Sequence, residues 1–212
     1  MTKDSSIYLI GLTGGIACGK STVLAMLAAL GARTIDADRL THRLQRPGTP
    51  VYQQIVAAFG PDILLEPGGP IDRRKLGALV FSDETKLRQL EQIVHPAVRA
   101  EIRSFLAQVA ATAGDRRQVA VIDAIKLIES GLAAECDQVW VVICPEAQQV
   151  ARLMETRGMS EAEARQRIAA QPPQESRLPH ATVVIDNSGT QTATRAQVDA
   201  AWQGVLTAIG GA

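Results

Sequence analysis

Residues 7–22, IYLIGLTGGIACGKST, decide the fold of this chain. The first half is apolar and β-branched, as in a strand that is buried on both faces, and it leads into GGIACGKS, which matches GxxxxGK[ST]. Gly14 and Gly19 allow successive backbone N–H groups to point into one concavity, where an anion fits. The sequence therefore predicts a phosphate-binding loop that follows a buried strand.

The segment after the glycines, residues 20–30, is rich in helix formers and is followed by Gly31. The N-terminus of such a helix stabilises a bound anion by about 0.3 to 2 kcal/mol. In this motif Lys20 reaches the β- and γ-phosphates and the Ser21 hydroxyl binds Mg²⁺, so ATP and Mg²⁺ are the expected ligands. The loop residues expected to bind ATP are Gly14, Gly15, Ile16, Ala17, Cys18, Gly19, Lys20, Ser21 and Thr22.

A Rossmann dinucleotide-binding turn is the main alternative for this loop. Asp36 and Asp38 follow Gly14 by about the 20 residues expected of a ribose-binding acid. A GxGxxG pattern that ends at Gly19 would, however, require glycine where the chain has Ile16. The pair Lys20 and Ser21 also has no role in a Rossmann site, so the phosphate-binding loop is the favoured interpretation.

Length and composition exclude several classes of protein. The 212 residues suffice for one α/β domain with insertions, and the 22 basic residues balance the 22 acidic ones, so no basic field attracts nucleic acid. Three cysteines without CxxC spacing fit a reducing cytosol, and Cys18 is interpreted as a small space-filling residue. Neither a signal peptide nor a membrane-spanning run is recognisable. We expect a soluble cytoplasmic protein that binds neither nucleic acid nor a membrane.

A second short strand, residues 32–35, delivers Asp36 and Asp38 to the edge of the sheet at which ligands bind in parallel α/β folds. Two acids that lie two residues apart in an extended segment point to opposite faces. One can then face the phosphate site while the other anchors the turn or caps the next helix. Helix capping by both acids is the structural alternative.

Amphipathic helices are expected over residues 40–114, where the pattern of buried strands is interrupted. Thr49 and Asp72 can each cap a helix. A further helix is expected to end before His95, so that Pro96 begins a long helix with one apolar stripe. The size and position of this insertion suit a substrate-binding lobe.

The sheet resumes with three apolar segments, residues 118–122, 138–144 and 181–185. The first of them ends in Asp123, which resembles the acid of a Walker B strand, although an acid at this place can equally be structural. With the two earlier strands these segments predict an α/β fold, a three-layer αβα arrangement around a parallel five-stranded sheet.

An arginine-rich pair of helices is expected between the last two strands. Pro145 is expected to begin the first, and Ser160 with Glu163 forms a capping box for the second. The pair is either a solvated face or a lid whose guanidinium groups close on a transferring phosphoryl group. The arginines in and just after this pair of helices are Arg152, Arg157, Arg165, Arg167 and Arg177.

The loop after the last strand, residues 186–189, is expected to hold adenine.

Taken together, these segments resemble the dephospho-coenzyme A kinase family. One departure is that many members read DxPLLFE where this chain reads DAIKLIE, at residues 123–129. The matching segments span nearly the whole chain in the order of the family: LTGGIACGKST (12–22), IDAD (35–38), RPG (46–48), HP (95–96), the helix with Arg152 and Arg157, QPPQESRL (171–178) and VIDNSG (184–189).

The resemblance implies a P-loop kinase fold, whose nucleotide-binding core comprises residues 1–39, 115–145 and 179–212. Residues 40–114 would form a helical substrate lobe that binds coenzyme A, and residues 146–178 a helical lid. The implied reaction is the ATP-dependent phosphorylation of the ribose 3′-hydroxyl of 3′-dephospho-coenzyme A, the last step of coenzyme A biosynthesis.

The resemblance also implies roles for individual residues. Asp38 is expected to orient the hydroxyl as a base, with Asp36 as its neighbour near the metal, while Lys20 and Arg152 complete the catalytic set. His42 and His180 receive no role. The further expected site residues are Arg157, Arg177 and Asn187 for ATP, and His95 and Lys126 with Asp38 for the substrate. A structural role for His95 and a solvated Lys126 are the alternatives. The partner that the resemblance implies is a small-molecule substrate, without an obligatory protein partner.

Two other functions remain open. A different P-loop kinase could act on a nucleoside, a nucleoside monophosphate or a small alcohol, since the core does not encode the acceptor. A nucleotide-operated switch could instead hydrolyse ATP to change the binding of a partner. No NKxD-like guanine motif is evident, and Asp36 and Asp38 suit acceptor activation better than the positioning of water.

Overall fold

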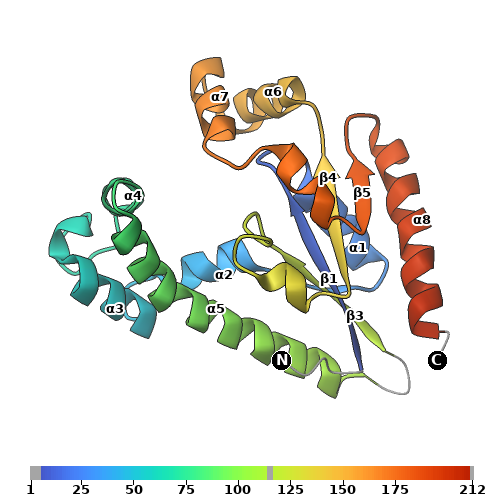
Figure 1. Cartoon of the computed structure of the whole chain (residues 1–212), viewed down its shortest axis with the longest axis horizontal. Helices are drawn as coiled ribbons and strands as arrows, with labels where there is room; N and C mark the ends of the chain where they lie inside the picture. Colours follow the sequence, from blue (N-terminus) through green and yellow to red (C-terminus); the bar gives the residue numbers. More distant parts are fainter. Residues whose placement is uncertain (1–5, 114–116, 211–212) are drawn as a thin grey trace. The chain divides into compact units, whose positions relative to one another are not determined.

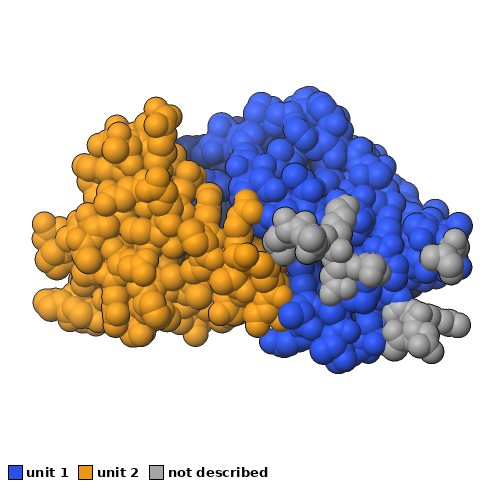
Figure 2. All heavy atoms as spheres, turned by 60° about the horizontal axis from the view of Figure 1, so that its bottom comes forward, with its two compact units in different colours: residues 1–35, 106–212 blue, residues 36–105 orange. Residues whose placement is uncertain are grey.

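The computed structural model describes residues 6–113 and 117–210 (Figure 1). The chain divides into two compact units (Figure 2). The first unit comprises Met1–Ile35 and Leu106–Ala212, and the second comprises Asp36–Phe105.

The strands are β1 (Ile7–Gly14), β2 (Arg33–Asp36), β3 (Gln118–Asp123), β4 (Gln138–Ile143) and β5 (Val183–Asp186). They form one five-stranded sheet in the order β2-β3-β1-β4-β5. β1 pairs in parallel with β3 and β4, and β4 pairs in parallel with β5. The expected parallel five-stranded sheet is thereby confirmed, with strand ends within two residues of the predicted ones.

The central position of β1 follows from its sequence, because all of its residues are buried, as a strand flanked by others and covered on both faces requires. Eight α-helices lie in the described part of the chain: α1 (Lys20–Ala29), α2 (Ala37–Leu44), α3 (Pro50–Phe59), α4 (Arg73–Phe81), α5 (Glu84–Ala111), α6 (Glu146–Arg157), α7 (Glu161–Ala169) and α8 (Gln191–Gly210). Short 3₁₀ helices add η1 (Pro61–Ile63), η2 (Leu132–Glu135), η3 (Gln174–Ser176) and η4 (Leu178–His180).

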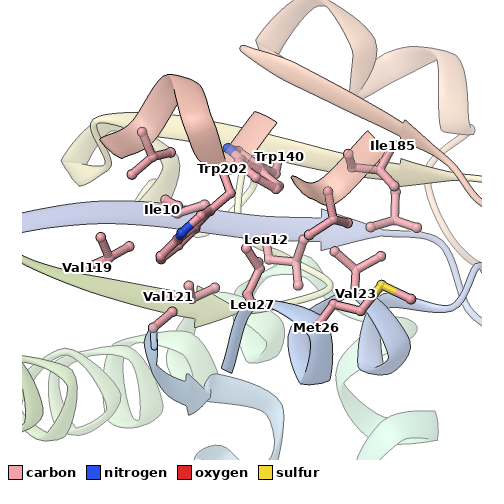
Figure 3. Packing of buried hydrophobic residues seen from close by; sticks show 14 of the residues in the cluster. Ile10, Leu12, Val23, Met26, Leu27, Val119, Val121, Trp140, Ile185 and Trp202 are labelled. Atoms are coloured by element: carbon pink, nitrogen blue, oxygen red, sulfur yellow. The ribbon is translucent and has the colours of Figure 1, made fainter. Parts of the chain in front are cut away.

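The main core lies between the sheet and helices α1 and α8. Figure 3 shows apolar side chains of β1, β3 and β4 meeting those of the two helices, with Trp140 and Trp202 among them. Trp202, on α8, is only 5% exposed. On the other face, a Cβ added at Gly11 would lie 2.6 Å from Leu127 Cδ2 and 2.8 Å from Cys136 Sγ, so these two side chains pack closely over the glycine.

The second unit consists of α2, α3, α4 and the part of α5 up to Phe105. Its helix starts agree with the predictions from capping residues. Thr49 caps α3 by accepting a hydrogen bond of 3.1 Å from Tyr52 N, and Asp72 caps α4 by accepting one of 2.8 Å from Arg74 N. Local side-chain chemistry thus fixes where these two helices begin.

The expected break before Pro96 is wrong, because α5 runs without interruption through this proline. Proline inside a helix removes one backbone hydrogen bond and costs about 3 kcal/mol relative to alanine. Val94, Val98 and Ile102 lie on both sides of it and are all at least 93% buried. Their spacing of four residues places them on one stripe, and burial of that stripe outweighs the cost of Pro96.

Helices α6 and α7 form a hairpin within the first unit. The capping box of Ser160 and Glu163 is present at the start of α7. Pro145 occupies the N-cap position of α6, one residue before its expected place in the first turn, and Gly158 ends the helix with φ 62°. The hairpin encloses a small apolar cluster of Ile16, Val150, Leu153 and Ala164. No helix in the described ranges combines the length and the apolar character that crossing a membrane requires.

Candidate active site

The glycine-rich loop between β1 and α1 has the geometry of a phosphate cradle. Gly19 adopts φ 94°, and a Cβ at this position would lie 2.0 Å from the side-chain nitrogen of Asn187, so both conformation and space require glycine. Ala17 also has a positive φ, 58°. Thr22 N donates to the carbonyl of Gly19 at 3.0 Å, but α1 begins at Lys20 without a side-chain cap, so no capping side chain competes with a ligand at the start of the helix.

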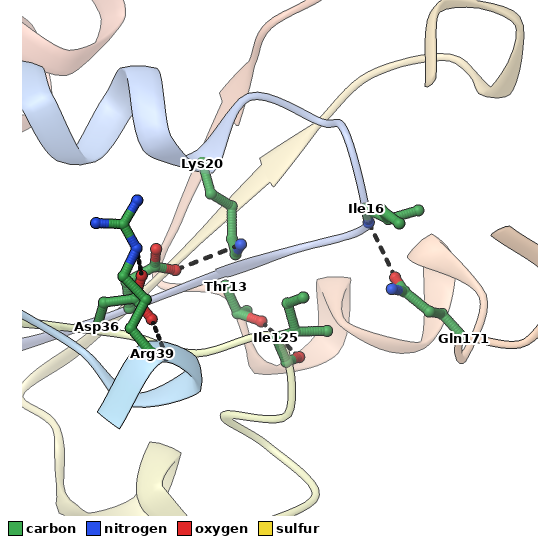
Figure 4. A network of polar contacts seen from close by, with 8 residues as sticks. Thr13, Ile16, Lys20, Asp36, Arg39, Ile125 and Gln171 are labelled. Carbon is green, nitrogen blue, oxygen red and sulfur yellow. Dashed lines mark hydrogen bonds and ion pairs between the residues drawn. The ribbon is translucent and has the colours of Figure 1, made fainter. Parts of the chain in front are cut away.

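Lys20 is held beside the acid at the end of β3. Its ammonium nitrogen lies 3.5 Å from a carboxylate oxygen of Asp123, and the two side chains are only 13% and 8% exposed (Figure 4). The hydroxyl of Thr13 donates a hydrogen bond of 3.1 Å to the carbonyl of Ile125, which fixes the segment after Asp123. A cation and a carboxylate are thus placed together at the phosphate loop.

Arg152 and Asn187 also contact the glycine-rich loop between β1 and α1. Arg152 donates to the carbonyls of Ala17 and Asn187 at 3.1 and 2.8 Å. The amide nitrogen of Asn187 donates to the carbonyl of Cys18 at 2.8 Å, and its oxygen accepts from the hydroxyl of Thr194 at 2.8 Å. The structure therefore brings two of the predicted site residues into direct contact with the loop, through its carbonyl groups.

Two glutamines that also hold the loop were missed in the sequence. The side-chain oxygen of Gln171 accepts a hydrogen bond of 2.9 Å from Ile16 N (Figure 4), and the amide of Gln149 donates to the sulfur of Cys18 at 2.7 Å. Gln171 opens the QPPQESRL segment, which was a usable signal. Gln149 lies three residues before Arg152, on the same side of α6, and only this spacing could have indicated it.

Cys18 is fully buried, and its thiol lies against that of Cys144. The hydrogen bond between the two thiols, with a further one from Gln149, lowers the pKa of Cys18 to about 6, although burial opposes this shift. The same contact and burial raise the pKa of Cys144. Cys18 is therefore the more acidic thiol of the pair.

The arginines of the hairpin region differ in their surroundings. Arg177 is 2% exposed and donates to the carbonyl of Pro172 at 3.0 Å, while its Nε and second terminal nitrogen have no hydrogen-bond partner in residues 6–113 and 117–210. Arg157 is exposed at the end of α6. Arg165 pairs with glutamates of both helices at 2.8 and 2.9 Å on the surface, as a solvated face predicts.

Of the two acids at the end of β2, Asp36 takes one of the expected positions and Asp38 does not. Asp36 is the N-cap of α2 and accepts a hydrogen bond of 2.8 Å from Arg39 N, with a second contact of 3.3 Å to the guanidinium (Figure 4). This cap starts the helix at Ala37, so Asp38 lies in the first helical turn and the expected extended geometry is wrong for it. Asp38 is half-buried, and an acid in the first turn interacts favourably with the helix dipole.

His95 and Lys126 are the remaining predicted substrate contacts. His95 is half-buried in the interior of α5, so it does not precede a helix start as the sequence suggested. Lys126 is exposed in the segment after β3, and its side chain makes no hydrogen bond or ion pair with the part of the chain that is described. Nothing in their surroundings assigns either residue to a ligand.

The second unit contains a cavity of about 580 Å³, which we call the arginine cavity. Arg73 donates a hydrogen bond to Nε2 of His42 at its wall. Burial and then the charge of Arg73 lower the pKa of His42, so the imidazole is neutral at neutral pH and accepts this bond. The residues that line the arginine cavity are His42, Gln45, Arg46, Pro47, Pro70, Ile71 and Arg73.

A parallel sheet whose central strand runs into a glycine-rich loop, with a lysine–aspartate pair at that loop, defines a P-loop kinase. Comparison with known families narrows this class, because the dephospho-CoA kinase family model matches residues 8–193. The chain belongs to the dephospho-CoA kinase family.

Individual relatives agree with this assignment. A dephospho-CoA kinase from Symbiobacterium thermophilum is 48% identical over 203 residues, which cover 96% of this chain and 83% of that protein. A crystal structure of a Thermus thermophilus protein has a TM-score of 0.79 and 30% identity, covering 95% of this chain and 98% of that one. A dephospho-CoA kinase from Campylobacter jejuni has a TM-score of 0.65 and 26% identity, covering 93% and 96%.

Proposed function

We propose that this chain transfers the γ-phosphoryl group of ATP to the ribose 3′-hydroxyl of 3′-dephospho-coenzyme A, giving coenzyme A and ADP in the last step of coenzyme A biosynthesis. Family membership over residues 8–193 supports the reaction and the substrate. The structural observation that carries the proposal is the buried contact of Lys20 with Asp123 at the uncapped start of α1.

The donor phosphates bind at the glycine-rich loop in this proposal, where the first N–H groups of α1 and the ammonium group of Lys20 meet the negative charge. The residues fit a magnesium ion, since Ser21 is exposed, the Asp123 carboxylate lies beside the neighbouring Lys20, and Mg²⁺ prefers oxygen ligands. Ser21 would hold the ion, which when bound neutralises charge on the β- and γ-phosphates.

Arginine side chains supply further charge to the donor site. Arg177 supports this role because a buried guanidinium with unfilled donors is costly unless an anion binds it. Arg152 already contacts the loop carbonyl of Ala17, so its remaining donor capacity lies beside the phosphates. Arg157, which is exposed on α6, would join them as a nucleotide contact when the hairpin acts as a lid over the site.

The acceptor hydroxyl is oriented by Asp38 in this proposal. The 3′ oxygen attacks the γ-phosphorus, the bond from that phosphorus to the β–γ bridging oxygen breaks, and the proton of the hydroxyl passes to the Asp38 carboxylate. ADP leaves with the bridging oxygen. Asp36 supports this geometry by capping α2, which carries Asp38.

The functional regions follow from these roles. Residues 40–114 would form the substrate lobe, with His95 and Lys126 as further candidate contacts of the acceptor, and residues 146–178 the lid. Adenine would lie at the loop after β5, where Asn187 is buried. The expected cytoplasmic location belongs to the same proposal, because both substrates are small molecules of the cell interior.

The direct test measures ADP release from ATP and Mg²⁺ by the purified protein with different acceptors. Dephospho-coenzyme A, AMP, pantetheine, shikimate and buffer alone form the panel. We expect turnover with dephospho-coenzyme A only. Turnover with another member of the panel would instead identify a different small-molecule kinase, and release that does not depend on an acceptor would identify a nucleotide-operated switch.

A further inference from the structure

We propose that the arginine cavity of the second unit binds the diphosphate group of the acceptor, between Arg46 and Arg73. The inference rests on the proposed function, because it assigns a second phosphate-binding position to the dinucleotide-like substrate of that reaction. The donor and the acceptor each carry a chain of phosphates, and the glycine-rich loop accounts only for that of the donor.

The lining of the arginine cavity carries positive charge. Two of the lining residues are arginines and none is an acid. The Arg46 side chain makes no hydrogen bond or ion pair within residues 6–113 and 117–210, and the contact of Arg73 is to the neutral imidazole of His42. Both guanidinium groups therefore keep donors for an anion, and the planar guanidinium matches phosphate oxygens in pairs.

The arginine cavity lies at the C-terminal end of α2, the helix that carries Asp38 near its start. Asp38, His42 and Gln45 follow one another at intervals of four and three residues, so they lie along one face of the helix and its C-terminal end. The helix rise puts about 6 Å between Asp38 and His42. In dephospho-coenzyme A the 5′-diphosphate is separated from the 3′-hydroxyl only by ribose carbons and the 5′ oxygen. One face of α2 can thus contact the hydroxyl at its start and the diphosphate near its end.

The size and remaining lining of the cavity agree with this ligand. Its volume of about 580 Å³ lies within the range of roughly 300 to 1,000 Å³ that is typical of small-molecule sites. Pro47, Pro70 and Ile71 form an apolar wall next to the arginines. Such a wall lowers the local dielectric and strengthens the contact of guanidinium with phosphate.

Equilibrium binding of dephospho-coenzyme A, measured by calorimetry, tests the assignment. We expect Arg46→Gln and Arg73→Gln each to raise the Kd for dephospho-coenzyme A by about 10-fold or more, because each removes charge-assisted hydrogen bonds. The Kd for ATP should stay within about twofold of the wild-type value. Added NaCl should weaken dephospho-coenzyme A binding less steeply in the variants, since they have lost a charge contact.

Arg43→Gln and Arg74→Gln are the matched controls. Each lies close in sequence to a cavity arginine, is exposed and does not line the cavity. They remove the same charge, so a general electrostatic effect would appear in them as well. We expect their Kd for dephospho-coenzyme A to change by less than about twofold, and circular dichroism verifies that all four variants are folded.

Normal binding by Arg46→Gln and Arg73→Gln, or equal weakening in the controls, would overturn the inference. Failure of the proposed function is a separate result, since the wild-type protein would then release no ADP with dephospho-coenzyme A. If wild-type turnover is present and the cavity variants bind normally, the reaction stands and the diphosphate lies elsewhere.

Discussion

At the scale of single residues, the sequence identifies those site residues that belong to a local motif. Lys20 and Gly19 belong to one spacing pattern, so their place at the start of α1 follows directly. Gln149 and Gln171 contact the same loop from 131 and 155 residues away in the chain. The QPPQESRL segment and the spacing of Gln149 from Arg152 could have drawn attention to these residues, but the atoms that they contact depend on tertiary packing.

Asp38→Asn should lower kcat by about 10²-fold or more, because a positioned base contributes roughly 10² to 10⁴. ATP binding should be kept, since the donor contacts lie elsewhere. Steady-state kinetics and an ATP titration measure the two effects. Asp62→Asn, an exposed acid of the same unit, is the control and should leave kcat unchanged. Turnover near the wild-type rate in Asp38→Asn would remove this residue from the mechanism.

Lys20→Ala should weaken ATP binding and slow phosphoryl transfer together, because the ammonium group stabilises charge in both the bound and the transition state. The change also leaves the Asp123 carboxylate, which is 8% exposed, without its cation, so the melting temperature should fall. Kinetics with a parallel melting curve separate the two effects. Lys86→Ala, at an exposed ion pair, is the control. Unchanged kinetics in Lys20→Ala would argue against a catalytic glycine-rich loop.

At the scale of elements, helix starts are predictable where a cap lies beside them, as Thr49, Asp72 and Ser160 show. Asp36 shows the limit of this reasoning. Its capping role was recognised as one alternative, but the helix that it starts takes in Asp38. At Pro96 a local signal gives the wrong prediction. The proline should break the helix, but α5 continues because its apolar stripe is buried, and this burial exists only in the folded unit.

Pro96→Ala should stabilise the protein by about 1 to 3 kcal/mol, because alanine restores the backbone hydrogen bond inside α5, while the greater freedom of the unfolded chain offsets part of the gain. Urea denaturation measures the change. Pro50→Ala is the matched control: this proline lies in the first turn of α3, where its missing N–H has no helical partner, so no gain is expected. A loss of stability in Pro96→Ala would show that the proline is required for the packing of α5.

At the scale of the whole molecule, the apolar segments of the sequence were sufficient to predict the sheet, since strands buried on both faces have few alternatives. The boundaries of the two compact units were harder to predict from the sequence. One unit comprises Met1–Ile35 with Leu106–Ala212, and the other comprises Asp36–Phe105. The boundary falls inside α5, a continuous helix, and no glycine- or proline-rich linker marks it at Phe105. The arginine cavity could not be found in the sequence either, because its lining comes from residues 42–47, at and after the end of α2, and from residues 70–73.

Nucleotide binding should be visible in the stability of the whole molecule. A ligand that binds only the folded state at 100 times its Kd adds about 2.7 kcal/mol. We therefore expect a non-hydrolysable ATP analogue with Mg²⁺ to raise the melting temperature of the wild-type protein and to have a much smaller effect on Lys20→Ala at the same concentration. Equal shifts in both proteins would place the nucleotide away from Lys20.

A crystal structure with a non-hydrolysable ATP analogue and dephospho-coenzyme A bound together tests the central claim most directly. The account predicts the terminal phosphate of the analogue on the loop N–H groups and the ribose 3′ oxygen at about 2.6 to 3.2 Å from the Asp38 carboxylate. A 3′ oxygen that lies beyond hydrogen-bond reach of Asp38, or a glycine-rich loop without phosphate, would contradict it.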